Sequence, residues 1–253
     1  MNPLHALLMV IAVVVTVTAI FVGWRWASRV WSLPCPSLVG WALESPFYGR
    51  ITGTEKTLER IGLKPGQRVL EIGPGPGRLL IPAARNVLPD GEAVGIDIQP
   101  GMVARLKERA QAANITNLTA ILGDATQPVV PEASFDVAFL VTTLGEIPDR
   151  AAALKQCFRA LKSGGVLSVS EMLPDPHYQS QGTVRCLAEA AGFRVQSVVG
   201  GAWLFTAVVY TQLRRRRPLH GMRFAPELEA GLICQTSMER ADVRRDCRGV
   251  AGD

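Results

Sequence analysis

The most constraining feature of the sequence is an apolar strand pattern that runs directly into a glycine-rich turn. The stretch Val69–Gly77 reads VLEIGPGPG, and a helical pattern follows it from Arg78. Glycine lets the backbone reverse sharply and approach a ligand closely, and the start of the next helix presents free N–H groups to that ligand. Glu71, at the end of the strand, can accept hydrogen bonds from a cation or a hydroxyl group. The stretch therefore predicts a ligand-binding unit of strand, turn and helix.

The spacing of the glycines distinguishes two kinds of nucleoside-binding turn. Dinucleotide-binding dehydrogenases use G-x-G-x-x-G, which counted from Gly73 requires a glycine at the position where this chain has Arg78. The motif resembles instead E/D-x-G-x-G-x-G, the first motif of class I S-adenosylmethionine-dependent methyltransferases. From this motif alone, a tight turn without a ligand stays an alternative. The resemblance implies cofactor contacts from Glu71, Gly73, Pro74, Gly75 and Gly77.

Acidic residues mark the ends of the next two predicted strands. The strand Val94–Ile98 contains Asp97, twenty residues beyond Gly77, and this spacing is typical of an acid that binds both ribose hydroxyls. A purely structural reading makes Asp97 the cap of the helix that follows. The strand Leu118–Leu122 leads to Asp124. In the methyltransferase family an acid at this position commonly bonds the adenine amino group, although an ordinary turn aspartate would look the same.

The resemblance continues through two further strands. Ser134–Val141 resembles the fourth strand of these enzymes, and Thr142–Ile147 is expected to form the floor of the cofactor pocket. Leu161–Glu171 resembles a helix end, a glycine turn and the fifth strand, with Gly164 and Gly165 as the helix C-cap. Further cofactor contacts implied by the resemblance are Ile98, Ala125 and Val141.

The fold class predicted from these patterns is α/β. The expected architecture is a Rossmann-like, doubly wound, mostly parallel seven-stranded sheet with an antiparallel final strand, preceded by one transmembrane helix. Short apolar runs alternate with helical patterns from Thr54 onward, which indicates helices on both faces of a parallel sheet. We assign the methyltransferase domain to residues 51–213. Residues 214–253 form a basic tail in this scheme, beginning with the cluster Arg214–Arg217. Such a tail can bind RNA or an anionic membrane surface, of which the anchor favours the membrane, or it can stay solvated and disordered.

The N-terminal segment predicts a membrane anchor. Leu4–Val22 is a run of nineteen residues without Asp, Glu, Lys or Arg, and a helix that crosses a bilayer needs about 20 apolar residues. We assign the anchor to residues 1–24 and an interfacial linker to residues 25–50, where Arg25 and Arg29 accompany several tryptophans. By the positive-inside rule, the chain is a single-pass membrane protein with a cytoplasmic catalytic domain. A cleaved signal peptide and a buried helix are the alternatives.

The cysteines indicate neither a disulfide framework nor a zinc site, because the five of them are scattered and contain no C-x-x-C pair. Reduced thiols agree with a cytoplasmic domain. No His, Cys or carboxylate cluster suggests a metal. Cys157 and Cys186 fall on predicted helices and are interpreted as packing residues.

The implied activity is methyl transfer from S-adenosylmethionine to a small hydrophobic or lipid acceptor at the membrane. The motifs look most like ubiquinone and menaquinone methyltransferases, and they also resemble bacterial phospholipid N-methyltransferases. Nucleic acid is not an expected partner, since no recognition module flanks the core. A catalytically silent nucleoside-binding membrane scaffold stays open, as does an NAD(P)-dependent oxidoreductase, which fits the glycine spacing less well. The candidates for a general base, each with a plain structural reading, are Glu146, Glu171, His177 and Tyr178.

Overall fold

Seven strands form one sheet in the part of the chain that the computed structural model describes, namely residues 2–31, 53–173, 175–201 and 204–211. The linker and tail expected from the sequence fall largely outside these residues. The elements in chain order are α1 (Pro3–Trp31), α4 (Thr54–Ile61), β1 (Arg68–Ile72), α5 (Leu80–Asn86), β2 (Glu92–Asp97), α6 (Pro100–Ala112), β3 (Leu118–Leu122), β4 (Phe135–Val141), the short 3-10 helix η2 (Leu144–Glu146), α7 (Arg150–Ala160), β5 (Leu161–Met172), α8 (Gln181–Ala190), β6 (Phe193–Gly200) and β7 (Leu204–Thr211).

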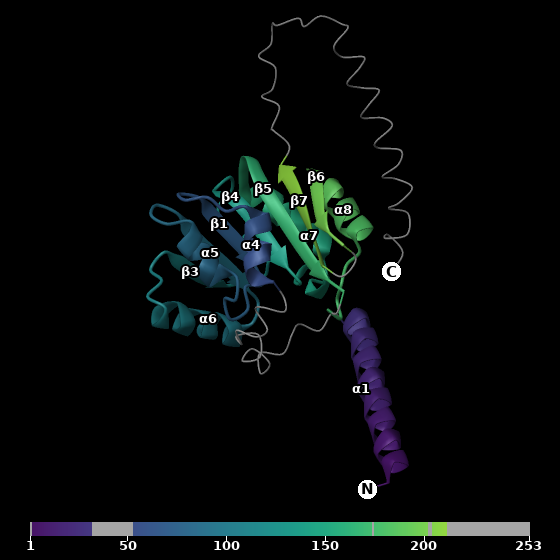
Figure 1. The fold of residues 1–253 in the computed structure, drawn as a ribbon. Coiled ribbons are helices and arrows are strands. Elements are labelled where there is room, and N and C mark those ends of the chain that lie inside the picture. Colours follow the sequence, from purple (N-terminus) through teal and green to yellow (C-terminus); the bar gives the residue numbers. More distant parts are fainter. Residues whose placement is uncertain (1, 32–52, 174, 202–203, 212–253) are drawn as a thin grey trace, which may run out of the picture.

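The order of the strands in the sheet is β3-β2-β1-β4-β5-β7-β6 (Figure 1). Strands β1 to β5 pair in parallel, and β7 lies antiparallel between β5 and β6. The chain builds the sheet outward from β1 to β3 and then crosses to the other side of β1 to add β4. Ligands of open α/β sheets bind where the order reverses in this way. The predicted Rossmann-like, mostly parallel architecture is confirmed.

Successive residues of the central strands pack against two different helical layers. Val69 of β1 and Phe139 of β4 belong to a buried cluster that includes residues of α4, α5 and α6. Leu70 and Leu140, their neighbours in sequence, belong to a second buried cluster with residues of α7 and α8. Consecutive side chains of a strand point to opposite faces, so a strand covered on both faces is apolar throughout. This is why these strands read as continuous hydrophobic runs.

The fifth strand begins earlier than the sequence pattern predicts. Helix α7 ends at Ala160, and Leu161 already pairs with β4. Residues 162–165 then bulge out before the parallel pairing with β4 resumes at Val166. Gly164 lies in this bulge with a φ of 79°, a left-handed conformation that favours glycine. The helix C-cap predicted at the two glycines is therefore wrong, because both glycines belong to the bulged start of a strand.

Helix α1 is long and apolar enough to cross a bilayer. The window Pro3–Ile20 has a mean hydropathy of 2.4, and none of it is buried inside the structure. The helix continues to Trp31, seven residues beyond the end of the predicted anchor, and stands apart from the sheet and its helices in Figure 1. A signal sequence near an N-terminus meets the same criteria of length and composition.

The two cysteines in the described α/β region differ in redox state. Cys157 on α7 is a free, buried thiol, and burial raises its pKa to about 12. It is therefore an inert packing residue, as the sequence suggested. Cys186 on α8 is disulfide-bonded. The expectation that this thiol is reduced is wrong, because scattered spacing along a sequence does not report which cysteines meet in the fold.

Candidate active site

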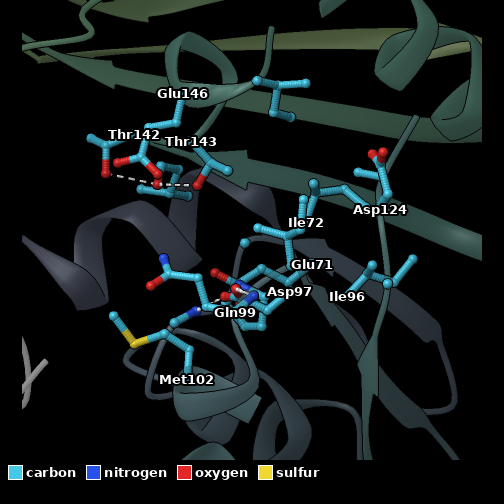
Figure 2. Close-up of a pocket in the computed structure, with 18 of the residues that line it drawn as sticks. Glu71, Ile72, Ile96, Asp97, Gln99, Met102, Asp124, Thr142, Thr143 and Glu146 are labelled. Carbon is cyan, nitrogen blue, oxygen red and sulfur yellow. Dashed lines mark hydrogen bonds between the residues drawn. The ribbon is translucent and has the colours of Figure 1, made fainter. Parts of the chain in front are cut away.

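A cavity of about 590 Å³ opens at the carboxyl ends of β1, β2, β3 and β4. This is the edge of the sheet where the strand order reverses, and the volume lies in the range of about 300–1,000 Å³ that is usual for small-molecule sites. Figure 2 shows Thr142, Thr143 and Glu146 on one side of the cavity, opposite Asp97 and Gln99. The loop that follows each of the four strands thus contributes one wall.

The glycine-rich turn after β1 forms the wall nearest the centre of the sheet. Gly73 and Gly75 adopt φ values of 68° and 53°. A Cβ on Gly73 would collide with the side chain of Thr143, with its Oγ1 only 2.9 Å away, whereas the Cβ position of Gly75 meets no atom within 4 Å. Gly73 therefore lets the turn pass directly beneath the loop after β4, and Gly75 leaves room in the cavity that a side chain would fill.

Gly77, the third glycine of the motif, allows close packing of the turn and does not make the cofactor contact that the resemblance implies. Gly77 does not line the cavity. Its φ is 84°, and a Cβ there would collide with Leu106 of α6 and lie 3.1 Å from the side chain of Ile81. Gly77 is thus required for close packing of the turn against α5 and α6. The expected cofactor contact of Gly77 is absent from the described cavity lining, because the helices occupy that side of the turn.

Glu71 is buried at the base of the cavity, and only 3% of its surface is exposed. Its Oε2 has no hydrogen-bond partner in the structure. Burial raises the pKa of Glu71 to about 8, while Arg78 acts to lower the pKa and Asp97 to raise it. A buried carboxyl oxygen without a partner is costly, and this one faces a cavity that can hold a hydrogen-bond donor.

Asp97 connects the end of β2 to the glycine-rich turn. Its Oδ2 accepts a hydrogen bond from the N–H of Gly75 at 3.1 Å, and its Oδ1 accepts one from the N–H of Gln99 at 2.9 Å. Burial raises the pKa of the Asp97 carboxyl, and these backbone N–H groups counteract the rise. The predicted acid is therefore at the cavity wall, where its remaining lone pairs can accept bonds from a diol. The helix-capping alternative is not met, because the N-cap of α6 is Gln99 and the Asp97 carboxylate bonds the N–H of that residue and not those of the first helical turn.

The remaining predicted cofactor contacts also line the cavity: Pro74, Ile98, Asp124, Ala125 and Val141. Ile98 is an apolar side chain that is 62% exposed, although it lies beside the cavity. A flat apolar ligand would cover it. Asp124 follows β3, and its Oδ1 accepts a hydrogen bond from the N–H of Thr126 at 2.8 Å, the geometry of an ordinary aspartate turn.

The floor of the cavity is the loop after β4, as the sequence predicted. Thr142, Thr143, Glu146 and Ile147 all line it. Thr142 has a φ of 54°, which is a strained conformation for a β-branched residue. Its N–H donates to the carbonyl of Ser170 on β5 at 2.8 Å, and its hydroxyl donates to the carbonyl of Val141 at 2.7 Å. Two hydrogen bonds therefore hold the strained residue in place.

Only one of the four candidates for a general base lines the cavity. Glu146 does so, whereas Glu171, His177 and Tyr178 are not among the lining residues. Sequence reasoning missed Asp149 and Asp175, which both line the cavity. Asp149 caps α7 by accepting a bond from the N–H of Ala152 at 2.8 Å, a role that its position three residues earlier signals. Asp175 has no such local signal, because the fold alone brings it to the cavity.

Two distant loops touch at the back of the cavity. A Cβ on Gly145, in the loop after β4, would overlap the carbonyl oxygen of His177, and the carbonyl carbon lies 2.7 Å from the same point. His177 follows β5 and is 5% exposed. Gln179 extends the contact, because its side-chain amide donates to the carbonyl of His177 at 2.7 Å. The absence of a side chain at Gly145 thus lets the loop after β5 approach the active-site floor.

Glu171 is buried beneath this contact. It is 1% exposed, its Oε1 has no hydrogen-bond partner, and its Oε2 accepts a bond from the N–H of Gln179 at 3.3 Å. Burial raises the pKa of Glu171 to about 8; the Gln179 N–H and Arg150 counteract the rise, whereas Asp175 and Glu146 reinforce it. Glu171 is therefore mostly protonated at neutral pH.

The stability of the fold should consequently fall as the pH rises. Glu71 and Glu171 have a pKa of 4.5 in an unfolded chain and about 8 in the fold, so between these pH values the folded state binds more protons than the unfolded state. Their contribution to stability is complete below pH 4.5 and is lost as the pH rises through 8. Glu171→Gln, which imitates the neutral carboxyl, should make the decline of Tm between pH 5 and 8 shallower. An unchanged slope would mean that Glu171 titrates normally.

The fold and the sequence both have known relatives. The family described as "Methyltransferase domain" matches residues 63–198, more than half of the 253-residue chain. The chain belongs to this methyltransferase family. The crystal structure of a SAM-dependent methyltransferase from Aquifex aeolicus shares the fold with a TM-score of 0.65 and 24% identity, covering 70% of this chain and 99% of that chain.

The names of the curated relatives give different substrates. Nocamycin O-methyltransferase from Saccharothrix syringae is 32% identical over 48% of this chain and 43% of its own length. Demethylmenaquinone methyltransferase from Geobacillus kaustophilus is 30% identical over 44% of this chain and 48% of its own length. The chain thus spans about half the length of the curated relatives it matches. What is shared is a class I S-adenosylmethionine-dependent methyltransferase domain.

The residues of the cavity fit S-adenosylmethionine. The unpartnered Oε2 of Glu71 suits a donor such as an ammonium group. The open position at Gly75 leaves room beside Asp97 for a sugar. The carboxyl-rich lining suits a cofactor with positive sulfonium and ammonium groups, because opposite charges attract strongly in a partly desolvated site. The predicted cofactor is therefore supported by the geometry as well as by the family.

Proposed function

We propose that this protein is a membrane-anchored S-adenosylmethionine-dependent methyltransferase that acts on a small hydrophobic or lipid acceptor. The observation that carries the proposal is the cavity at the switch point of the sheet, where Glu71, Gly75 and Asp97 converge. When bound there, S-adenosylmethionine supplies a methyl group that its sulfonium already activates. The protein must then mainly align the acceptor, and alignment alone can lower a barrier by as much as about 7–11 kcal/mol.

The cofactor would occupy the walls formed by β1, β2 and β3. In this arrangement Asp97 binds the ribose hydroxyls, Glu71 binds the amino group of the methionine part, and Ile98 covers the adenine ring. Asp124 and the N–H of Ala125 would contact the adenine edge. The support for these roles is that each residue lines one continuous cavity and matches the methyltransferase motif. Gly73, Pro74 and Val141 would contribute packing around the cofactor.

The binding roles can be tested by calorimetric titration of the full chain with S-adenosylmethionine, S-adenosylhomocysteine and NADH. Binding of the two sulfur nucleosides without NADH is the expected result. Binding of NADH instead would contradict the proposal and favour an oxidoreductase. Binding of the nucleosides without methyl transfer to any lipid-extract component would favour a silent scaffold.

The acceptor would bind over the loop after β4, next to Glu146. Apolar side chains of Met102 and Ile147 line the cavity together with Pro148, and they suit a hydrophobic acceptor. Two relatives agree with this class, because their names contain nocamycin and demethylmenaquinone. No nucleic acid is needed as a partner in this proposal.

Glu146 is the residue that we expect to handle the acceptor proton, since it is the one general-base candidate in the cavity lining. Glu146→Gln should lower turnover by about 10²–10⁴-fold, the usual contribution of general acid–base catalysis, without weakening cofactor binding. Steady-state rates with calorimetric affinities for S-adenosylmethionine would check this. Glu108→Gln, at an exposed position of α6, is the matched control. Unchanged turnover of Glu146→Gln at saturating acceptor would remove Glu146 from the chemistry.

The membrane part of the proposal rests on α1. Its apolar side chains are exposed, for example Val15 at 61% and Ile20 at 66%, and fully exposed apolar helices are unstable in water. The full chain should therefore stay in the membrane fraction during carbonate extraction at high pH, and a variant that begins at residue 32 should be released. Release of the full chain would show that α1 does not span the bilayer.

The side of the membrane on which the domain lies is a separate part of the proposal. Arg25 and Arg29 at the end of α1 favour a cytoplasmic domain, whereas the disulfide at Cys186 is a feature more common outside the cytoplasm. We propose the cytoplasmic orientation on the basis of the arginines. Protease protection in sealed vesicles tests it: digestion of the domain only from the cytoplasmic side is expected, and protection from that side would reverse the assignment.

A further inference from the structure

Two contacts hold the backbone of Gly145, the residue before Glu146 in the loop after β4. On one side, the carbonyl of His177 lies against Gly145, and its carbon is 2.7 Å from the position that a Cβ would take. On the other side, Nη2 of Arg150, the first residue of α7, donates to the Gly145 carbonyl at 3.3 Å. A shift of either partner would therefore move the backbone that brings Glu146 to the cavity.

Glu171 interacts with both of these partners. Its Oε2 accepts a hydrogen bond from the N–H of Gln179 at 3.3 Å, and the side-chain amide of Gln179 donates to the carbonyl of His177 at 2.7 Å. Arg150 acts on Glu171 electrostatically. Glu171 itself is 1% exposed and is not among the residues that line the cavity. It can therefore influence the acceptor only through these neighbours.

Glu171 and Arg150 form no hydrogen bond with each other, although each has an atom available for one. Oε1 of Glu171 and Nε of Arg150 are both buried, and neither has a hydrogen-bond partner in the structure. The first can accept and the second can donate. An ionised carboxylate attracts a guanidinium more than a neutral carboxyl group does, because charge-assisted hydrogen bonds are about twice as strong as neutral ones. The observed position of Arg150, on the carbonyl of Gly145, is the one expected beside a neutral Glu171.

We propose that Glu171 is a positioning residue, whose proton decides whether Arg150 holds Gly145 or Glu171. In the neutral state of Glu171, Arg150 stays on the Gly145 carbonyl. When Glu171 loses its proton, it draws the guanidinium of Arg150 to Oε1, the hydrogen bond to Gly145 breaks, and the loop after β4 is released. This inference rests on the proposed function, in which Glu146 on that loop handles the acceptor proton.

The pH at which the loop is released follows from the surroundings of Glu171. The charged groups that act on Glu171 come from α7, from η2 and from the loop after β5: Arg150, Glu146 and Asp175. Burial raises the pKa of Glu171 to about 8; the N–H of Gln179 and Arg150 counteract the rise, whereas the two carboxylates add to it. Glu171 is thus neutral below this pH and ionised above it. His177 and Tyr178 in the same loop are titratable as well, so the test must distinguish their protons from that of Glu171.

The test measures the exchange of backbone amides in the loop by hydrogen–deuterium exchange and mass spectrometry. The full chain in phosphatidylcholine nanodiscs, saturated with S-adenosylhomocysteine, is measured between about pH 6 and about pH 10, and each rate is divided by the intrinsic exchange rate at that pH. The peptide of residues 142–149 contains the amides of Glu146 and Ile147, which donate to Thr143 at 3.0 Å and to Leu144 at 3.3 Å. Its protection should fall by at least about 3-fold as the pH rises through 8, since one lost hydrogen bond lowers local stability by an amount of this order.

Two variants and a control assign the change to Glu171. Glu171→Gln keeps the size and the neutral state of the side chain, so the loop should stay protected over the whole pH range. Arg150→Gln removes the cation that holds Gly145, so protection should be low at every pH and show no transition. Glu108→Gln, at an exposed position of α6, is the matched control and should behave as the parent protein does.

A parent protein without a transition near pH 8 would overturn the inference. A transition that Glu171→Gln leaves unchanged would also overturn it, because the proton would then belong to another group such as His177 or Tyr178. The peptide of β2, residues 92–97, should stay almost unexchanged over the same minutes; if it exchanges together with the loop, the whole fold opens and the positioning role is wrong.

The binding of S-adenosylhomocysteine at neutral pH is measured first, so that two failures can be distinguished. Its absence would count against the proposed function itself. Binding of S-adenosylhomocysteine without the transition in the loop would count against the positioning role of Glu171 alone.

Discussion

Replacing Asp97 by alanine is expected to weaken the binding of S-adenosylmethionine by at least about 100-fold. Hydrogen bonds to a charged acceptor contribute about 1.5–3 kcal/mol each, and the proposed role gives Asp97 two ribose hydroxyls. The substitution also leaves the N–H groups of Gly75 and Gln99 without the partners that they have at 3.1 and 2.9 Å. The glycine-rich turn would then lose part of its preorganisation. Isothermal titration of the full chain measures the change directly.

The matched control for this experiment is Asp90→Ala, which removes an exposed carboxyl group outside the cavity. It should bind S-adenosylmethionine as the parent protein does. Asp97→Asn is informative as a second variant, because it can keep an acceptor for one backbone N–H while losing the charge. An affinity within about three-fold of the parent for Asp97→Ala would contradict the assigned ribose role, since a single lost charged hydrogen bond already exceeds that factor.

Gly145→Ala is expected to be the most damaging conservative substitution in the active site. The new Cβ would overlap the carbonyl oxygen of His177, which is backbone and cannot rotate away. Forcing extra volume into a packed site costs about 1–3 kcal/mol, so Tm should fall by about 2–12 °C in a domain of this size. Turnover should also fall at temperatures where the variant is still folded, because Glu146 and Asp175 lie on the two loops that must separate.

Gly201→Ala is the control for the alanine itself, since a Cβ at Gly201 meets no atom within 4 Å. Its Tm should differ from the parent by less than the change in Gly145→Ala. A Gly145→Ala variant with the parent's Tm and turnover would show that the loops after β4 and β5 adapt freely. The close contact between them would then not be needed for stability or activity.

The cofactor side of the site could be predicted from the sequence because its signals are local. Gly73, Gly75 and Asp97 occur at strand ends with characteristic spacing, and the structure brings them to one cavity. The acceptor side could not be predicted to the same depth. Asp175 reaches the cavity, and Glu171 becomes buried, only through the approach of two loops that lie about thirty residues apart in sequence.

The errors have the same physical origin. Gly77 looks like a third ligand-binding glycine, but its partners Leu106 and Ile81 belong to helices whose packing the motif does not encode. The glycines near Lys162 look like a helix cap, yet Lys162 is held by Asp136 at 2.7 Å beside a strand bulge. In each case a local pattern was correct about the need for glycine and wrong about the neighbour that requires it.

The positive φ of Thr142 has a consequence for how the active site can change. A β-branched residue in this conformation destabilises the fold by about 1–3 kcal/mol, and glycine would remove that penalty. A glycine would keep the N–H bond to Ser170 but lose the hydroxyl bond to the Val141 carbonyl, which helps to fix the direction of the loop toward Glu146. Selection for a more heat-resistant protein should therefore find Thr142→Gly easily, and the variants so obtained should be stable proteins that methylate poorly.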